Sequence, residues 1–199
     1  MDSPKEKSTK ERLLSSGSLL FGEKGYSQVS VREICKHAHT SMNMIHHYFG
    51  SKEGLYEAIV DHFDTQLFAM PIKLLDKSPR SKEDFQARIE WLFETTLDAY
   101  LANKAILVLV DREQPKLDSL IEFSIAFKDF IEQAKQLGFA RKELDAEMVL
   151  GFMLDRIHNQ VQFLPWIKKN HGLDIENDKA YRAHWCAANV DLFMNGIAS

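Results

Sequence analysis

The sequence has 199 residues, enough for one large or two small domains. Hydrophobic residues make up 45% of it and charged residues 27%, which is typical of a globular protein with an ample core and argues against a disordered chain. Two cysteines are too few for a disulfide framework, no apolar segment approaches the ~18 residues of a membrane span, and no apolar leader opens the sequence, so we expect a cytoplasmic protein without a membrane contact.

The formal net charge of −4 is unevenly distributed along the chain. Residues 1–52 contain eight Lys or Arg and five Asp or Glu, a balance of +3. Residues 53–199 contain 17 and 24, a balance of −7. A basic head on an acidic body is expected when a phosphate-binding domain is joined to one that does not bind phosphate.

The first predicted helix begins near Ser8, where Ser8 and Glu11 have the spacing of a capping box, and ends near Gly25. Its core-facing residues recur at helical spacing. They are Leu13, Gly17, Leu20 and Phe21. The preceding residues carry Lys5 and Lys7, and they form either an arm that touches phosphate or a simple tail.

Two short helical patterns follow in residues 30–52. In the first, Ser30 and Glu33 form a capping box before apolar positions at i, i+3, i+4 and i+7. These positions are Val31, Ile34, Cys35 and Ala38; those of the second pattern are Ile45, Tyr48 and Phe49. Thr40 or Ser41 can cap the second helix. Because so few residues separate the two helices, they must cross steeply, which predicts a helix-turn-helix.

The outward face of the second short helix carries hydrogen-bonding, methyl-bearing and imidazole side chains but no carboxylate. It consists of Ser41, Met42, Asn43, Met44, His46 and His47. Such a face can enter the major groove of DNA, because an acidic face would be repelled by phosphate. Met42, Asn43, Met44 and His47 are the candidates for base contacts, and Asn43 can pair bidentately with adenine.

Phosphate contacts are expected around this helix. Lys52 begins the next helix, where its charge and the helix amides can meet the same phosphate. Ser30 and Tyr48 are further candidates, although Ser30 is also explained as a cap, Tyr48 as a core residue and Lys52 as a solvated charge. The complete set of predicted DNA-binding residues is Ser30, Arg32, Thr40, Ser41, Met42, Asn43, Met44, His46, His47, Tyr48 and Lys52.

Residues 9–63 resemble the DNA-binding region of the TetR family of transcriptional regulators. The matching segments are LFGEKGY at residues 20–26, SVREI at 30–34, IHHYF at 45–49 and GSKEGLYEAI at 50–59. The sequence departs from the family pattern at three positions. His39 replaces the usual Gly of the turn, Asn43 replaces a small residue, and His46 replaces a frequent Tyr.

The remaining chain predicts further helices and no strand. A connecting helix, capped by Ser51, is expected over about 51–70 and to end at Pro71. Later helices are expected at about 81–102, 105–112, 115–138, 145–168 and 174–194, with the fourth weakened at Pro165. We therefore predict an all-α fold of about nine helices. Residues 1–52 form the helix-turn-helix domain, and residues 53–199 form a helical bundle for effector binding and dimerisation.

The last two predicted helices carry apolar faces that are wide for one small body. One stripe consists of Ala180, Ala183, Ala187, Val190 and Met194, with Tyr181, Trp185, Ala188 and Leu192 beside it. The preceding helix carries Val149, Met153, Ile157, Val161 and Leu164. Small residues permit close helix approach, so we expect a homodimer with a four-helix interface, and the resemblance implies the same arrangement. The alternative is packing within one chain.

The resemblance also implies a pocket in the body for a small hydrophobic effector. The candidates to line it are Trp91, Tyr100, Arg112, Phe123, Phe127, His158 and Phe163. Periodicity does not separate pocket from core, so these aromatic residues could equally be core. Asp155 and His158 are polar lining of the cavity, a satisfied buried pair or an interface contact.

Other chemistry finds little support. The histidines at 37, 39, 46 and 47 lack cysteine partners and point in different directions, so we expect no metal and no cofactor. The sequence contains no nucleophile–base set, so we expect no enzyme. The predicted function is a sequence-specific regulator that binds double-stranded DNA, a repressor released from an inverted-repeat operator by a small effector. The alternative is a DNA-bound regulator whose body binds a protein partner.

Overall fold

The computed structural model describes residues 8–195, so the basic residues Lys5 and Lys7 lie outside the described part. The described residues form ten α-helices and no strand, which confirms the all-α prediction. The helices are α1 Thr9–Lys24, α2 Val31–His37, α3 Asn43–Phe49, α4 Lys52–Leu75, α5 Lys82–Ala102, α6 Lys104–Glu113, α7 Asp118–Gln136, α8 Ala146–Gln162, α9 Leu164–His171 and α10 Lys179–Asn195. None of these helices is long and apolar enough to cross a membrane.

Two prolines act differently from the prediction. Pro71 lies inside α4 instead of ending it. The helix continues because Phe68 and Leu75, on either side of the proline, are both buried, and their packing outweighs the lost backbone hydrogen bond. Pro165 does not kink one long helix but stands in the first turn of a separate one, α9, where a missing N–H costs nothing. This break gives ten helices where about nine were expected.

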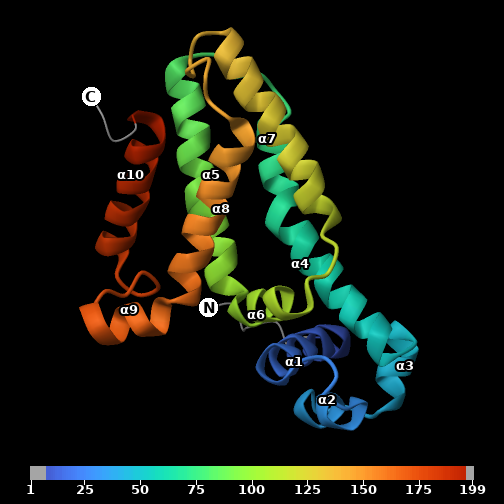
Figure 1. The fold of residues 1–199 in the computed structure, drawn as a ribbon. Helices are drawn as coiled ribbons and strands as arrows, with labels where there is room; N and C mark the ends of the chain where they lie inside the picture. The colour runs from blue at the N-terminus through green and yellow to red at the C-terminus, as the bar shows by residue number, and fades with distance from the viewer. Residues whose placement is uncertain (1–7, 196–199) are drawn as a thin grey trace, which may run out of the picture. The chain divides into compact units, whose positions relative to one another are not determined.

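The chain divides into two compact units. The first contains the described residues up to Thr65 together with Asn103–Leu117. Within it, α1 packs directly on α6 (Figure 1). A Cβ atom on Gly22 would lie 2.3 Å from the carbonyl oxygen of Ala105, so the two backbones can meet only because residue 22 is glycine. A helix late in the sequence therefore completes the core of the N-terminal unit.

The second unit contains Gln66–Ala102 and the described residues from Asp118 onward. In it α5 packs against both α8 and α10, and α7 packs against α8 (Figure 1). Phenylalanines fill its centre: Phe68 stacks on Phe123 with ring centroids 5.1 Å apart, and Phe127 and Phe130 are fully buried. Aromatic pairs of this kind stabilise a core beyond their buried area.

Candidate nucleic-acid interface

The helix α2 begins at a side-chain cap. The Glu33 amide donates to the Ser30 hydroxyl oxygen at 3.2 Å, as the sequence predicts. The Glu33 carboxylate also pairs with Lys24 at the end of α1. The hydrogen bond between them lowers the pKa of Glu33 and raises that of Lys24, so both stay charged near neutral pH. This pair ties α2 to α1.

The turn between α2 and α3 contains a left-handed residue. His39 has φ +50°, and the Thr40 amide then donates to the Cys35 carbonyl at 2.9 Å. The predicted cap at Thr40 or Ser41 is wrong, because α3 begins at Asn43 behind Met42 and has no side-chain cap. Instead, the Met44 amide donates to the Ser41 carbonyl at 3.1 Å, closing the first turn with backbone alone.

Replacing His39 by glycine should stabilise the first unit. A side chain at φ +50° carries a steric cost that glycine lacks. Glycine is also more flexible in the unfolded chain, which offsets part of this relief. We therefore expect a net gain of roughly 0.5 kcal/mol in the free energy of unfolding, measured by urea denaturation. His39→Ala keeps a Cβ and should show no gain. Equal losses in both variants would contradict backbone strain at this turn.

Buried side chains hold α3 against the rest of the first unit. Ile45 is 2% exposed and Ile34 is fully buried. Arg12 of α1 donates through Nε to the Ala38 carbonyl at 3.1 Å, satisfying an otherwise unpaired group at the end of α2. This role has no signal in the sequence, because an arginine on a helix with one apolar face looks like a solvated charge. Burial raises the pKa of the Cys35 thiol, which favours the neutral form.

The opposite face of α3 is open to solvent. Ser41, Met42, Asn43, His46 and His47 are exposed, and Met44 is half-buried. Tyr48 is 39% exposed and its ring lies 4.9 Å from that of His47, so it is not a core residue. The structure therefore brings most of the predicted base-reading residues onto one surface, and α3 contributes no carboxylate to it.

Cations border this surface. The Lys52 Nζ lies 4.2 Å from the centroid of the Tyr26 ring, which holds the ammonium at the start of α4. Arg32 and Lys36 are exposed on α2, and the Lys10 Nζ lies 6.0 Å from the Phe49 ring. Burial, followed by nearby carboxylates, raises the pKa of Tyr26, so its ring stays neutral under Lys52.

The joint between α3 and α4 is very tight. The Gly54 amide donates to the Ser51 hydroxyl oxygen at 3.0 Å, as the predicted cap requires. A Cβ atom on Gly54 would lie only 2.0 Å from the Phe49 carbonyl oxygen. The glycine therefore fixes how α3 leaves the core and where Lys52 stands.

The predicted effector-binding residues fall into several environments. In the first unit, Arg112 Nη1 donates to the Phe21 carbonyl at 3.5 Å, at the end of α1. In the second unit, Phe123 and Phe127 are fully buried core residues. Tyr100 meets His158 edge to face at 6.1 Å. Trp91 is half-buried, and Phe163 is 57% exposed.

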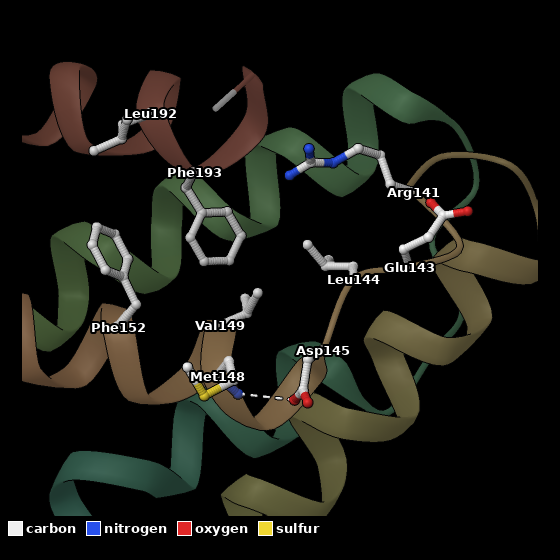
Figure 2. A pocket seen from close by; sticks show the side chains of 9 residues that line it. All are labelled: Arg141, Glu143, Leu144, Asp145, Met148, Val149, Phe152, Leu192 and Phe193. Carbon is white, nitrogen blue, oxygen red and sulfur yellow. Dashed lines mark hydrogen bonds between the residues drawn. The ribbon is translucent and has the colours of Figure 1, made fainter. Parts of the chain in front are cut away.

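Two pockets among the described residues of the second unit are lined mainly by apolar side chains. One, of about 480 Å³, lies between the start of α8 and the end of α10. Figure 2 shows Phe193 of α10 directed toward Val149 of α8, with Phe152 beside it and Arg141 at one end. The other, of about 360 Å³, includes Phe163 of the predicted set. Across residues 8–195 no three His, Cys, Asp or Glu side chains are grouped to hold a metal ion.

Comparison with known proteins agrees with the helix-turn-helix. Residues 13–59 match the family model of bacterial regulatory proteins of the tetR family. The HTH-type transcriptional repressor KstR2 of Mycobacterium tuberculosis is 26% identical over 158 residues, which cover 74% of this chain and 77% of the relative.

Solved structures share the whole fold. The ketosteroid regulator KstR2 of Mycobacterium tuberculosis superposes with a TM-score of 0.70 at 21% identity, over 98% of this chain and 97% of the other. FadR from Bacillus subtilis, solved in complex with stearoyl-CoA, gives a TM-score of 0.66 at 16% identity, over 94% and 98%. Residues 13–59 of this chain therefore match the N-terminal domain of the tetR family of bacterial regulatory proteins, and its whole length shares the fold of solved transcriptional regulators.

Proposed function

We propose that this protein is a repressor that binds an inverted-repeat operator as a homodimer and is released by a small, largely apolar effector. The observation that carries the proposal is the solvent-exposed, carboxylate-free surface of α3, which is fixed from behind by Ile45 and bordered by Lys52 and Arg32. A rigid helix with this chemistry suits the major groove of DNA.

Base and phosphate contacts divide between two sets of residues. Asn43 can pair with adenine, and the exposed Met42 offers a methyl group to thymine. Met44 and His47 complete the base-reading set. We assign the positioning of the protein on phosphates to Ser30, Arg32, Tyr48 and Lys52, with Thr40, Ser41 and His46 as further candidates.

The dimer would form through exposed residues of α8 and α10. Most of the apolar residues predicted for this interface on the helix before α10 cannot contact a second copy. Met153, Ile157, Val161 and Leu164 are buried within one chain. The same helix exposes Met148 by 72% and Phe152 by 42%, and α10 exposes Leu192 by 37%. The predicted small-residue stripe also remains open at Ala183 and Ala187. A second copy would cover this apolar face and set two recognition helices roughly 34 Å apart.

Release by an effector is supported by similar proteins. FadR from Bacillus subtilis, which shares this fold, was solved in complex with stearoyl-CoA. In this chain α4 runs through both units, so a ligand that prefers one arrangement of the second unit can bias the first. The shift is limited to the difference in the ligand's affinity for the two states.

A binding-site selection from random duplexes, followed by fluorescence anisotropy at low and high salt, tests the proposal. We expect an inverted repeat to be enriched and to bind tightly at low ionic strength. Folded protein that binds no duplex under these conditions would overturn the repressor function. A duplex bound with the same affinity by every variant of the α3 surface would also do so.

Replacing Lys52 by alanine should weaken binding to all DNA sequences alike. One lost phosphate contact should lower the slope of log affinity against log salt by about 1. Lys52→Arg keeps the charge and should retain most of the affinity, and Lys169→Ala on α9 is a control for the loss of an exposed lysine. A change confined to one base position would show that Lys52 reads bases instead.

A further inference from the structure

A fixed arginine lies between α8 and α10. The Arg156 Nε donates to Asn189 Oδ1 at 3.0 Å, and its guanidinium lies 4.9 Å from the Trp185 ring centroid. Asn189 is itself held, because its Nδ2 donates to the Trp185 carbonyl at 2.7 Å. Within residues 8–195, the structure shows no acceptor for the two terminal nitrogens of Arg156. The cation is thus positioned while part of its hydrogen-bonding capacity stays open.

Two buried donors near this arginine have no acceptor. Gln160, one turn further along α8, is 3% exposed, and its Nε2 has no hydrogen-bond partner among the described residues. Trp185 is 4% exposed, and its Nε1 also lacks a partner there. Buried donors in folded proteins are nearly always paired, so an acceptor from outside the chain, a water molecule or a ligand atom, would satisfy these groups.

The second apolar pocket includes both Arg156 and Gln160. Its six lining residues are Arg156, Asn159, Gln160, Phe163, Trp166 and Ile167. They include one cation and no carboxylate. The Asn159 amide is already used, because its Nδ2 donates to the Asp155 carbonyl at 2.8 Å. Phe163 and Trp166 are 57% and 56% exposed, which leaves two aromatic surfaces open beside the polar end.

The geometry points to a binding site for a small carboxylate with a flat apolar body. The carboxylate oxygens would accept from the terminal nitrogens of Arg156 and from Gln160, and the apolar body would lie against Phe163 and Trp166. A volume of about 360 Å³ suits a molecule of one or two rings. An apolar segment of a second copy fits less well, because it would cover the arginine and leave the Gln160 donor unpaired.

The regulatory meaning of this site rests on the proposed function: its ligand would be the class of effector to which the repressor responds. Binding itself does not depend on DNA. The two ideas can therefore fail separately, since a protein that binds no operator but does bind the carboxylate contradicts the repressor function alone.

The test uses 2-naphthoate and its uncharged methyl ester, titrated into the full-length protein by calorimetry. We expect 2-naphthoate to bind at least about tenfold more tightly than the ester, because only the anion pairs with Arg156. Gln160→Met keeps the side-chain volume but removes the donor. This substitution should lower the affinity for 2-naphthoate by about tenfold, while the melting temperature of the free protein stays unchanged or rises. Arg156→Met should weaken binding at least as much.

Arg141→Met is the matched control, because Arg141 lines the pocket between α8 and α10 that contains Phe193. The affinity of this variant for 2-naphthoate should equal that of the wild type. No heat with 2-naphthoate up to millimolar concentration would overturn the site. Equal affinities for acid and ester, or wild-type affinity in Gln160→Met, would do the same. A Gln160→Met variant that shifts the monomer–dimer equilibrium without changing naphthoate affinity would assign the surface to contact between copies and also overturn it.

Discussion

Gly54→Ala is expected to abolish operator binding while the second unit remains folded. Alanine is intrinsically the better helix former by about 1 kcal/mol, so propensity alone predicts a more stable α4. The added Cβ would, however, stand 2.0 Å from the Phe49 carbonyl oxygen, which is backbone and cannot rotate away. Opening this joint should cost about 1–3 kcal/mol and outweigh the gain.

The displaced groups explain the size of the functional effect. Phe49 ends α3 and Lys52 begins α4, so a shift at Gly54 moves both the proposed recognition surface and the cation proposed to meet phosphate. Misplacing a bidentate base contact alone costs about 1–3 kcal/mol, and a dimer suffers the loss twice. We therefore expect at least a 100-fold loss of affinity for the selected operator, measured by fluorescence anisotropy.

Gly151→Ala is the matched control. Gly151 also lies inside a helix, α8, but no atom is found within 4 Å of the position a Cβ would take. This variant should gain up to about 1 kcal/mol of stability in urea denaturation, which is the quantity that it controls, because Gly151 neighbours Phe152 of the proposed interface. If Gly54→Ala instead behaved like Gly151→Ala, the close contact at the α3–α4 joint would not control the recognition helix.

Phe152→Lys is expected to convert the dimer into monomers. Phe152 is 42% exposed on α8, so its replacement removes little packing within one chain, and Asp155 three residues on can accommodate the new charge. In a two-fold interface the substitution places two lysines against apolar surface. Each buried, unpaired charge costs several kcal/mol, so the dissociation constant of the dimer should rise by at least about 100-fold.

Light scattering across micromolar concentrations measures this change. Ile125→Lys is the control: Ile125 is 59% exposed on α7, outside the proposed interface, and Asp129 lies one turn on. The Ile125→Lys variant should have the molar mass of a dimer, and the Phe152→Lys variant should have the molar mass of one chain. Operator affinity should fall together with dimerisation, since a single recognition helix reads only half of the repeat. A wild-type protein that is monomeric at these concentrations would refute the interface.

The sequence alone determined the local structure of the helix-turn-helix segment. Helical spacing around Ile34 and Ile45, the cap at Ser30 and the short turn between them restrict residues 30–52 to one local arrangement, because all these signals act over a few residues. Even the strained position could be anticipated, since His39 stands where a glycine is usual and has φ +50°. The same local signals predicted the all-α fold.

Only the tertiary structure decided what covers each apolar face. Periodicity marked α6 as apolar but could not reveal that it packs on Gly22 of α1, more than 80 residues earlier. The same periodicity fits Met153 and Ile157 equally well to an interface and to the core, and the structure buries both in the core. The open donors at Gln160 and Trp185 have no sequence signature at all. A spacing rule identifies which side of a helix avoids water, whereas the neighbour that covers this side depends on contacts between distant residues.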